Sequence, residues 1–203
     1  MGGYRGAPAM RRDIRRVIVG LQGSGKTVLA KHLIAQYRKV GVSTLVIDYQ
    51  HEYNGKNHTA YRITDRVNPT VEVDNVLQKL IIDPYEDKIP LKRRYGHLIL
   101  DETPRYFALH KPLPPAMGRI NDVGRHIGIA TTSIGRRFSQ MHTDLVELAH
   151  EVYIFRQSGI NDLRRANDMR AGLADIVGNL APHHYVKLDM TTGDITVKKP
   201  VKM

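Results

Sequence analysis

The stretch of sequence that decides the fold is Gly20-Leu21-Gln22-Gly23-Ser24-Gly25-Lys26-Thr27. It fits the phosphate-loop pattern, in which a glycine, four further residues, Gly-Lys and a serine or threonine follow one another. The apolar run Arg16-Val17-Ile18-Val19 before it suits a buried parallel strand, and residues 28–34 after it carry apolar side chains at helical spacing. Strand, glycine turn and helix therefore come in the order that phosphate binding requires.

The residue types within this loop indicate how it would hold a triphosphate. Its glycines let the backbone curl so that several N–H groups point at one anion, and the helix that begins near Lys26 adds its positive dipole end. The Lys26 ammonium can reach the β- and γ-phosphates, and the Thr27 hydroxyl can ligate Mg²⁺. We therefore predict that ATP is bound by Gly20, Leu21, Gln22, Gly23, Ser24, Gly25, Lys26, Thr27 and Val28. The alternative is a glycine-rich turn that matches the pattern by chance.

A second chemical landmark is the apolar strand His97-Leu98-Ile99-Leu100, which ends in Asp101-Glu102. A phosphate-loop ATPase needs carboxylates opposite its glycine loop. Asp101 can hold the hydration shell of Mg²⁺, and Glu102 can polarise the attacking water. Many strands end in acidic residues, but this one follows a phosphate loop and a β-α-β region. We predict Lys26 and Glu102 as catalytic residues, and Thr27 and Asp101 as the metal ligands.

A third polar segment, Asp48 to Tyr53, follows the predicted strand Ser43–Asp48. In open α/β sheets ligands bind at the carboxyl ends of the strands, which is where Asp48 and Glu52 fall. Glu52 is a candidate for orienting water or the nucleotide. A purely structural polar loop explains the same residues equally well.

Length and composition narrow the class of protein. The chain has 203 residues, no cysteine and a formal net charge of +11. We predict a basic flexible arm over residues 1–13 and one ATPase domain over residues 14–203, because domains commonly hold about 100–200 residues. The lack of cysteine excludes disulfides and thiolate metal sites. No apolar run approaches the ~18 residues of a membrane span, and the positive charge favours a polyanionic partner, although a basic surface kept for solubility is the alternative.

The remaining pattern predicts alternating strands and helices. Helices are expected over residues 26–40, 74–82, 117–123, 138–149 and 161–169. Strands are expected over residues 71–73, 129–133 and 151–156, and strand, turn and strand over residues 185–197. Residues 54–68 and 84–94 are expected to be surface loops. The fold class that follows is α/β, with a mainly parallel sheet flanked by helices and a β-hairpin at the C-terminus.

Taken together, these landmarks resemble the HerA/FtsK superfamily of DNA-pumping ATPases, and within it the genome-packaging ATPases of icosahedral viruses with an internal membrane. The matching segments are residues 20–27, 48–53, 100–103, 124–129, 131–144 and 152–156. The resemblance spans roughly Val17 to Arg165. It implies a RecA-like core that assembles into a homo-oligomeric ring, usually a hexamer, and moves double-stranded DNA through its centre with ATP and Mg²⁺.

The resemblance also implies an arginine supplied in trans to the neighbouring nucleotide, and Arg125 is our first choice for it. Capsid or internal-membrane proteins would be further partners, and the location would be the host cytoplasm or the packaging vertex of the virion. The chain departs from the family where a glutamine and Arg-Pro usually end the fourth strand, since it has Thr132-Ser133-Ile134-Gly135-Arg136-Arg137. Thr132 and Ser133 are both open as the γ-phosphate sensor.

Four functions remain open at this point. The first is a motor that packages DNA into a capsid, with phosphate contacts from basic residues such as Arg136, Arg137, Arg164 and Arg165. A related extrusion or conjugation ATPase would be expected to carry a membrane segment. A small-molecule kinase would transfer phosphate to a bound acceptor, whereas Glu102 beside Asp101 favours activation of water. The fourth is a nucleotide-dependent switch without catalysis.

Overall fold

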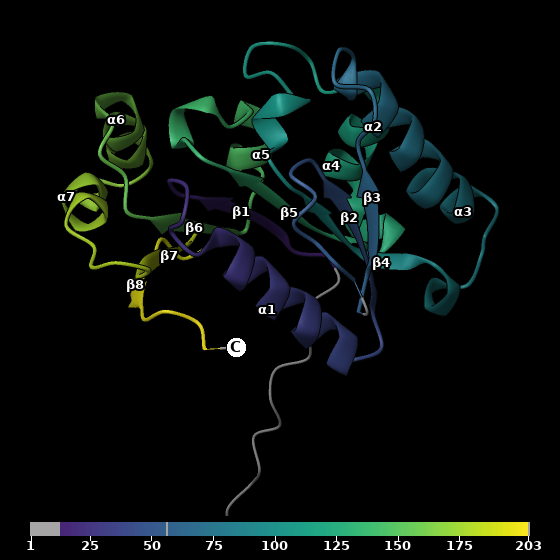
Figure 1. Cartoon of the computed structure of the whole chain (residues 1–203), viewed down its shortest axis with the longest axis horizontal. Helices are drawn as coiled ribbons and strands as arrows, with labels where there is room; N and C mark the ends of the chain where they lie inside the picture. Colours follow the sequence, from purple (N-terminus) through teal and green to yellow (C-terminus); the bar gives the residue numbers. More distant parts are fainter. Residues whose placement is uncertain (1–12, 56, 203) are drawn as a thin grey trace, which may run out of the picture.

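The computed structural model describes residues 13–55 and 57–202, and all strands of this part form one sheet. The strand order is β3-β2-β4-β5-β1-β6-β7-β8 (Figure 1). The strands from β3 to β6 are mutually parallel, and β7 and β8 pair antiparallel at one edge. This is the predicted α/β fold with its C-terminal hairpin. The predicted arm, residues 1–13, lies outside the described residues except for Asp13.

The strands are β1 (Arg15–Val19), β2 (Ser43–Asp48), β3 (Thr59–Arg62), β4 (Tyr95–Leu100), β5 (Ala130–Gly135), β6 (Glu151–Phe155), β7 (Tyr185–Asp189) and β8 (Ile195–Lys198). The helices are α1 (Lys26–Lys39), α2 (Pro69–Leu77), α3 (Asp83–Glu86), α4 (Pro115–Ile127), α5 (Thr143–Glu147), α6 (Ile160–Met169) and α7 (Leu173–Gly178). Shorter helical turns are η1 (Gln78–Ile82, a π-helix) and the 3₁₀ turns η2 (Leu91–Arg93), η3 (Thr103–Arg105) and η4 (Phe138–Gln140). Within the described ranges, none of the helices has the length and apolarity that crossing a membrane demands.

Both faces of the sheet are covered, so its central strands are apolar on both sides. Ile18, Val46 and Ile99 pack with α1 on one face. Leu98 and Leu100 alternate to the other face, where they pack with α2 and α4, and a further cluster joins β1 and β6 to α5, α6 and α7. Because Asp101 follows Ile99 by two residues, this alternation directs it to the face of α1 and the glycine loop.

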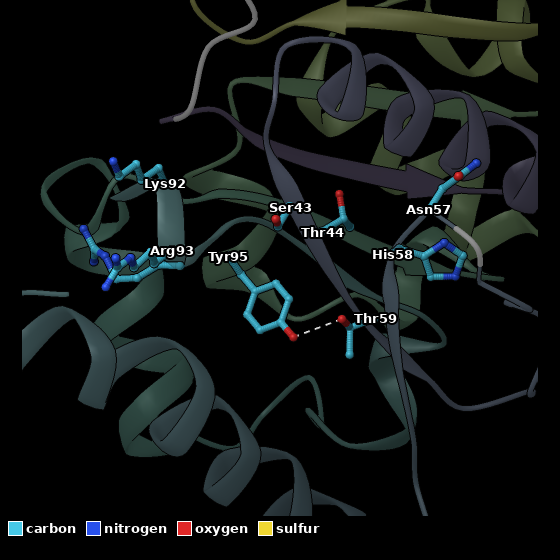
Figure 2. Close-up of a pocket in the computed structure, with 9 residues that line it drawn as sticks. Ser43, Thr44, Asn57, His58, Thr59, Lys92, Arg93 and Tyr95 are labelled. Carbon is cyan, nitrogen blue, oxygen red and sulfur yellow. Dashed lines mark hydrogen bonds between the residues drawn. The ribbon is translucent and has the colours of Figure 1, made fainter. Parts of the chain in front are cut away.

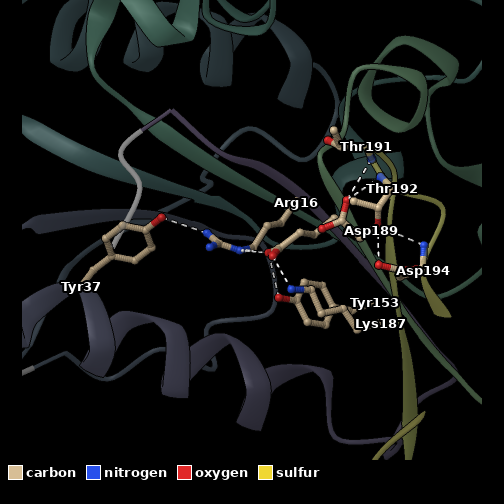
Figure 3. A network of polar contacts seen from close by, with 9 residues as sticks. Arg16, Tyr37, Tyr153, Lys187, Asp189, Thr191, Thr192 and Asp194 are labelled. Atoms are coloured by element: carbon tan, nitrogen blue, oxygen red, sulfur yellow. Dashed lines mark hydrogen bonds and ion pairs between the residues drawn. The ribbon is translucent and has the colours of Figure 1, made fainter. Parts of the chain in front are cut away.

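A buried polar network ties α1 to the sheet (Figure 3). The Arg16 guanidinium donates to the Tyr37 hydroxyl of α1 at 2.8 Å and to the Glu151 carboxylate of β6 at 2.8 Å. Lys187 of β7 completes the ion pair with Glu151, and Tyr153 donates its hydroxyl to the same carboxylate. Since each buried charge has an opposite charge or a hydrogen bond, the network fixes α1 over β1 and β6 without leaving a lone buried ion.

The structure differs from the sequence expectation in several segments. Residues 71–73, predicted as a short strand, lie in α2, because Pro69 starts a helix whose Val73 and Leu77 face the core four residues apart. The predicted loop over residues 54–68 contains the edge strand β3, whose half-exposed residues give little hydrophobic alternation. The helix predicted over residues 138–149 is divided into η4 and α5.

Glu72 anchors the segment between β3 and α2. Its carboxylate accepts hydrogen bonds from the N–H groups of Thr64 and Asp65, at 3.0 and 2.6 Å, and from the hydroxyls of Tyr61 and Thr64, at 2.7 and 2.8 Å. Although burial opposes the shift, these donors lower the pKa of Glu72 from 4.5 to about 2.

We expect Glu72→Gln to lower the free energy of unfolding by about 1–2 kcal/mol at pH 7, because an amide replaces a charged acceptor of several hydrogen bonds. A lowered native pKa stabilises the fold above the unfolded pKa, and this stabilisation is lost as the pH falls toward the native value. The difference in the free energy of unfolding between wild type and variant, measured by urea denaturation, therefore narrows as the pH falls from about 4.5 toward 2. A difference that stays constant over that range would contradict the assigned role of the carboxylate.

Candidate active site

The glycine loop lies between β1 and α1, at the carboxyl edge of the sheet. Gly23 and Gly25 have φ angles of 74° and 110°, which side chains rarely adopt, so glycine is required at both positions. At Gly20 a side chain would meet Phe155 and Ser24 within 2.6 Å. The loop therefore has the tight curve that the sequence predicts, with Gly25 at the N-cap of α1.

Lys26 and Thr27 begin α1 and point toward carboxylates. The Lys26 ammonium donates to the carbonyl of Leu21 at 2.9 Å, and burial lowers its pKa while the charges of Glu102 and Asp101 oppose that shift. The Thr27 hydroxyl donates to Glu52 at 2.9 Å. The structure thus brings Lys26 and Thr27 together with the acidic residues that follow β2 and β4.

Asp101 and Glu102 directly follow β4, which is separated from β1 in the sheet by β5 alone. Both side chains are buried, and Glu102 has a φ of 52°, a strained value for a residue with a side chain. The turn after them is fixed by Thr103, whose hydroxyl donates to the carbonyl of Leu100 and accepts from the N–H of Ile134. The hydroxyl of Tyr106 also donates to the carbonyl of Asp101. Neighbouring strands therefore hold this pair in place.

The residues around Asp101 fit a magnesium ion bound with a triphosphate. One carboxylate oxygen of Asp101 is buried without a hydrogen-bond donor. Burial, together with the charges of Glu102, Asp48 and Glu52, raises the pKa of Asp101 to about 7. A cation would offset both effects, and the Thr27 hydroxyl is the second oxygen available to it. In the described part of the chain no group of three acidic, histidine or cysteine side chains could hold a metal ion.

Arg136 is the residue of this site whose role the sequence did not indicate. Its guanidinium donates to Glu102 at 2.8 Å, and this hydrogen bond raises the pKa of Arg136. The Thr132 hydroxyl instead contacts His97 at 3.1 Å inside the sheet. Ser133 pairs with Leu100, on the face that α2 and α4 cover. Of the residues considered for γ-phosphate sensing or DNA contact, Arg136 is the one placed beside Glu102.

Asp48 has a structural role in the loop that carries Glu52. Its carboxylate accepts hydrogen bonds from the N–H groups of Glu52 and Tyr53, both at 3.0 Å, and it is fully buried. This contact shapes the turn and directs Glu52 toward Thr27. The sequence left Glu52 open between a site residue and an ordinary loop residue, and its contact with Thr27 places it at the site.

An apolar pocket of about 220 Å³ adjoins the other side of the glycine loop. Val28 and Leu29 of α1, Phe155 of β6 and Tyr185 of β7 line it, together with Pro200 and Val201 near the C-terminus. His183 borders the pocket and contacts the carbonyl of Ser24 at 3.3 Å. A flat apolar group held beside the loop would be accommodated here.

Arg125 lies away from its own glycine loop. It is exposed near the C-terminal end of α4, and α4 leads into the first residues of β5 at the amino edge of the sheet. β5 has six residues, so the two edges are roughly 17 Å apart along the strands. Arg125 therefore cannot act on the nucleotide of its own subunit.

Solved structures with a similar fold cover nearly the whole chain. The genome-packaging NTPase B204 of Sulfolobus turreted icosahedral virus 2, in complex with ATP-γS, superimposes with a TM-score of 0.80 at 22% identity, over 95% of this chain and 100% of that one. B204 of Sulfolobus turreted icosahedral virus, a DNA-packaging ATPase, gives 0.80 at 21% identity over the same shares. The chain shares the fold of B204.

A more distant likeness links the fold to a larger protein. The cytoplasmic domain of the type VII secretion ATPase EccC of Thermomonospora curvata gives a TM-score of 0.58 at 11% identity, over 94% of this chain and 24% of that chain. No protein-family profile matches the sequence, and no curated protein matches it. The likeness is therefore one of fold, and the site residues described above carry the functional argument.

Proposed function

We propose that the chain is an ATP-hydrolysing motor that moves double-stranded DNA into a viral capsid. The observation that carries this proposal is the buried pair Asp101 and Glu102. The pair follows β4, two strands from β1, and its negative charges are close enough to Lys26 to oppose the lowering of the Lys26 pKa by burial. The fold that the chain shares with two packaging NTPases also supports a packaging function. Assembly into a ring, a hexamer by family resemblance, and contact with capsid proteins belong to the proposal.

In this proposal each residue of the site has a separate part in hydrolysis. The glycine-loop N–H groups and Lys26 hold the β- and γ-phosphates, and Lys26 offsets the negative charge that develops on them. Glu102 accepts the proton of the attacking water, while Arg136 fixes the orientation of its carboxylate. Thr27 and Asp101 would hold Mg²⁺, which neutralises phosphate charge when bound.

We propose that the apolar pocket beside Val28 binds the nucleoside part of ATP. Phe155 and Tyr185 offer aromatic surface for a base, and the pocket starts at Gly25, where the phosphates of a nucleotide would enter the loop. The strained Glu102 and this pocket then lie on opposite sides of the triphosphate. Such an arrangement leaves the γ-phosphate, and not the base, facing the carboxylates.

The test is the ATPase rate of the assembled protein with and without duplex DNA at low salt. A DNA motor couples ATP hydrolysis to movement along DNA, so we expect the duplex to stimulate turnover. The stimulation should depend little on the DNA sequence, because phosphate contacts carry no sequence information. An intact ring whose rate is unaffected by duplex would contradict the proposal. Transfer of the γ-phosphate to a nucleoside monophosphate by a monomer would support a kinase instead.

A further inference from the structure

A polar cleft of about 510 Å³ lies at the amino edge of the sheet, where β2, β3 and β4 begin (Figure 2). Lys92, Arg93 and Arg94 of the segment before β4 line one part of it, and Ser43, Asn57 and Thr59 supply hydroxyl and amide groups. Figure 2 shows Lys92 and Arg93 on one side of the cleft and Asn57 on the other. All charged groups that line this basic cleft are cations.

The three cations of the basic cleft are not neutralised by nearby carboxylates. Lys92 and Arg93 are exposed, and within residues 13–55 and 57–202 none of the three forms an ion pair. Three consecutive like charges repel one another, and no described carboxylate offsets that repulsion. An uncompensated group of this kind is the electrostatic footprint of a polyanion site.

Arg94 gives the cleft a fixed and unsatisfied donor. Its guanidinium lies over the ring of Tyr85, with 5.4 Å between the guanidinium carbon and the ring centroid, so the side chain is held at the cleft wall. Its Nε is inaccessible to solvent and has no hydrogen-bond partner among the described residues. Although the Nε itself is buried, the Arg94 guanidinium has no acceptor among the described residues, and a phosphate oxygen is the acceptor that matches a guanidinium best.

Two of the four basic residues that the sequence indicated for DNA contact are already engaged within the subunit. Arg136 donates to Glu102, and Arg165 donates to the carbonyls of Phe138 and Met141 at 2.8 and 2.7 Å. Binding of a DNA phosphate by either residue would break these contacts. The basic cleft faces no such competition.

We propose that the basic cleft binds backbone phosphates of duplex DNA, with Lys92 and Arg93 making the ionic contacts and Arg94 a fixed hydrogen bond. This inference rests on the proposed DNA-translocating function and identifies the surface that would bind the duplex DNA. Backbone phosphates suit the cleft because its hydroxyl and amide groups are also phosphate donors.

The test compares two charge-matched double variants in duplex binding. Lys92→Gln/Arg93→Gln removes two cations from the cleft and keeps Arg94 on Tyr85, so the packing of the segment is preserved. Lys198→Gln/Lys199→Gln removes the same charge from the exposed end of β8. Affinity for a fluorescent duplex is measured over a range of KCl concentrations with a non-hydrolysable ATP analogue, using two unrelated DNA sequences.

We expect the cleft variant to bind both duplexes about 10- to 100-fold more weakly, with the slope of log affinity against log salt reduced by about 1.8, because two phosphate contacts are lost. The β8 variant keeps the wild-type slope. If the cleft variant kept the wild-type slope and affinity, the DNA-binding role of the basic cleft would be wrong, and the proposed motor function would be unaffected. Loss of DNA-free ATPase with unchanged duplex binding would also overturn that role and point to a neighbour's triphosphate as the anion. A wild-type protein that binds no duplex would overturn the proposed function as well.

Discussion

Replacing Glu102 by glutamine lowers the ATPase rate by about 10²- to 10⁴-fold in our expectation, while ATP binding is retained. The amide has the shape of the carboxylate but cannot accept the proton of the attacking water, and a general base contributes about this much to a rate. The Arg136 guanidinium can still donate to the amide oxygen, so the local structure is kept. The variant would therefore accumulate the ATP-bound state.

The measurement is single-turnover hydrolysis together with ATP affinity for wild type, Glu102→Gln and Glu52→Gln. Glu52→Gln is the matched control, because Glu52 lies at the same site and its carboxylate accepts a hydrogen bond from the Thr27 hydroxyl. If Glu52→Gln abolished hydrolysis with binding retained and Glu102→Gln did not, the catalytic base would have been assigned to the wrong carboxylate. A protein whose turnover is negligible before any substitution would instead be a nucleotide-dependent switch.

The glycine loop and β4 were predictable from sequence because their signals are local. Gly23 and Gly25 occupy positive-φ positions that other residues avoid, and the apolar strand ending at Asp101 is read from consecutive residues. The carboxylates were expected opposite the glycine loop, and the structure places them after β4, two strands from β1, but the order of the strands itself was not predicted. The segment between β2 and β4 was predicted less well, because residues 71–73 were expected to form a strand and lie in α2.

The parts that sequence could not provide depend on contacts between distant segments. Arg136 and Glu102 are 34 residues apart and meet only because β4 and β5 are neighbours in register. The same register assigns Thr132 to a buried contact with His97 and Ser133 to the opposite face. A pattern of residue types indicates where a strand ends. The face of the sheet to which a side chain points can be assigned only when the neighbouring strand and its register are known.

Replacing Arg125 by alanine lowers turnover by about 10³- to 10⁵-fold in our expectation, with the affinity of the isolated subunit for ATP nearly unchanged. The physical reason is its position: the exposed guanidinium lies at the amino edge of the sheet, and the glycine loop lies at the carboxyl edge. It can stabilise the charge of a transferring phosphate only in a neighbouring subunit of a ring.

The matched control is Arg119→Ala, which removes another exposed arginine from the same helix. Arg119 pairs with Glu86 of α3 on the surface, and such a pair contributes little to stability. We expect Arg119→Ala to keep the wild-type rate. Weak ATP binding by Arg125→Ala as an isolated subunit would show that Arg125 acts within its own chain or supports the fold.

Mixing two inactive variants distinguishes an arginine acting in trans from one that supports assembly. Arg125→Ala subunits keep Glu102, and Glu102→Gln subunits keep Arg125, so one kind of mixed interface unites an intact base with an intact arginine from the neighbour. We therefore expect an equimolar mixture to regain ATPase activity that neither variant has alone, in proportion to the mixed interfaces formed. If Arg125 acted on its own nucleotide, every subunit in the mixture would still lack one of the two groups. Activity would then stay at the level of the separate variants, and the arginine in trans would have to be sought elsewhere.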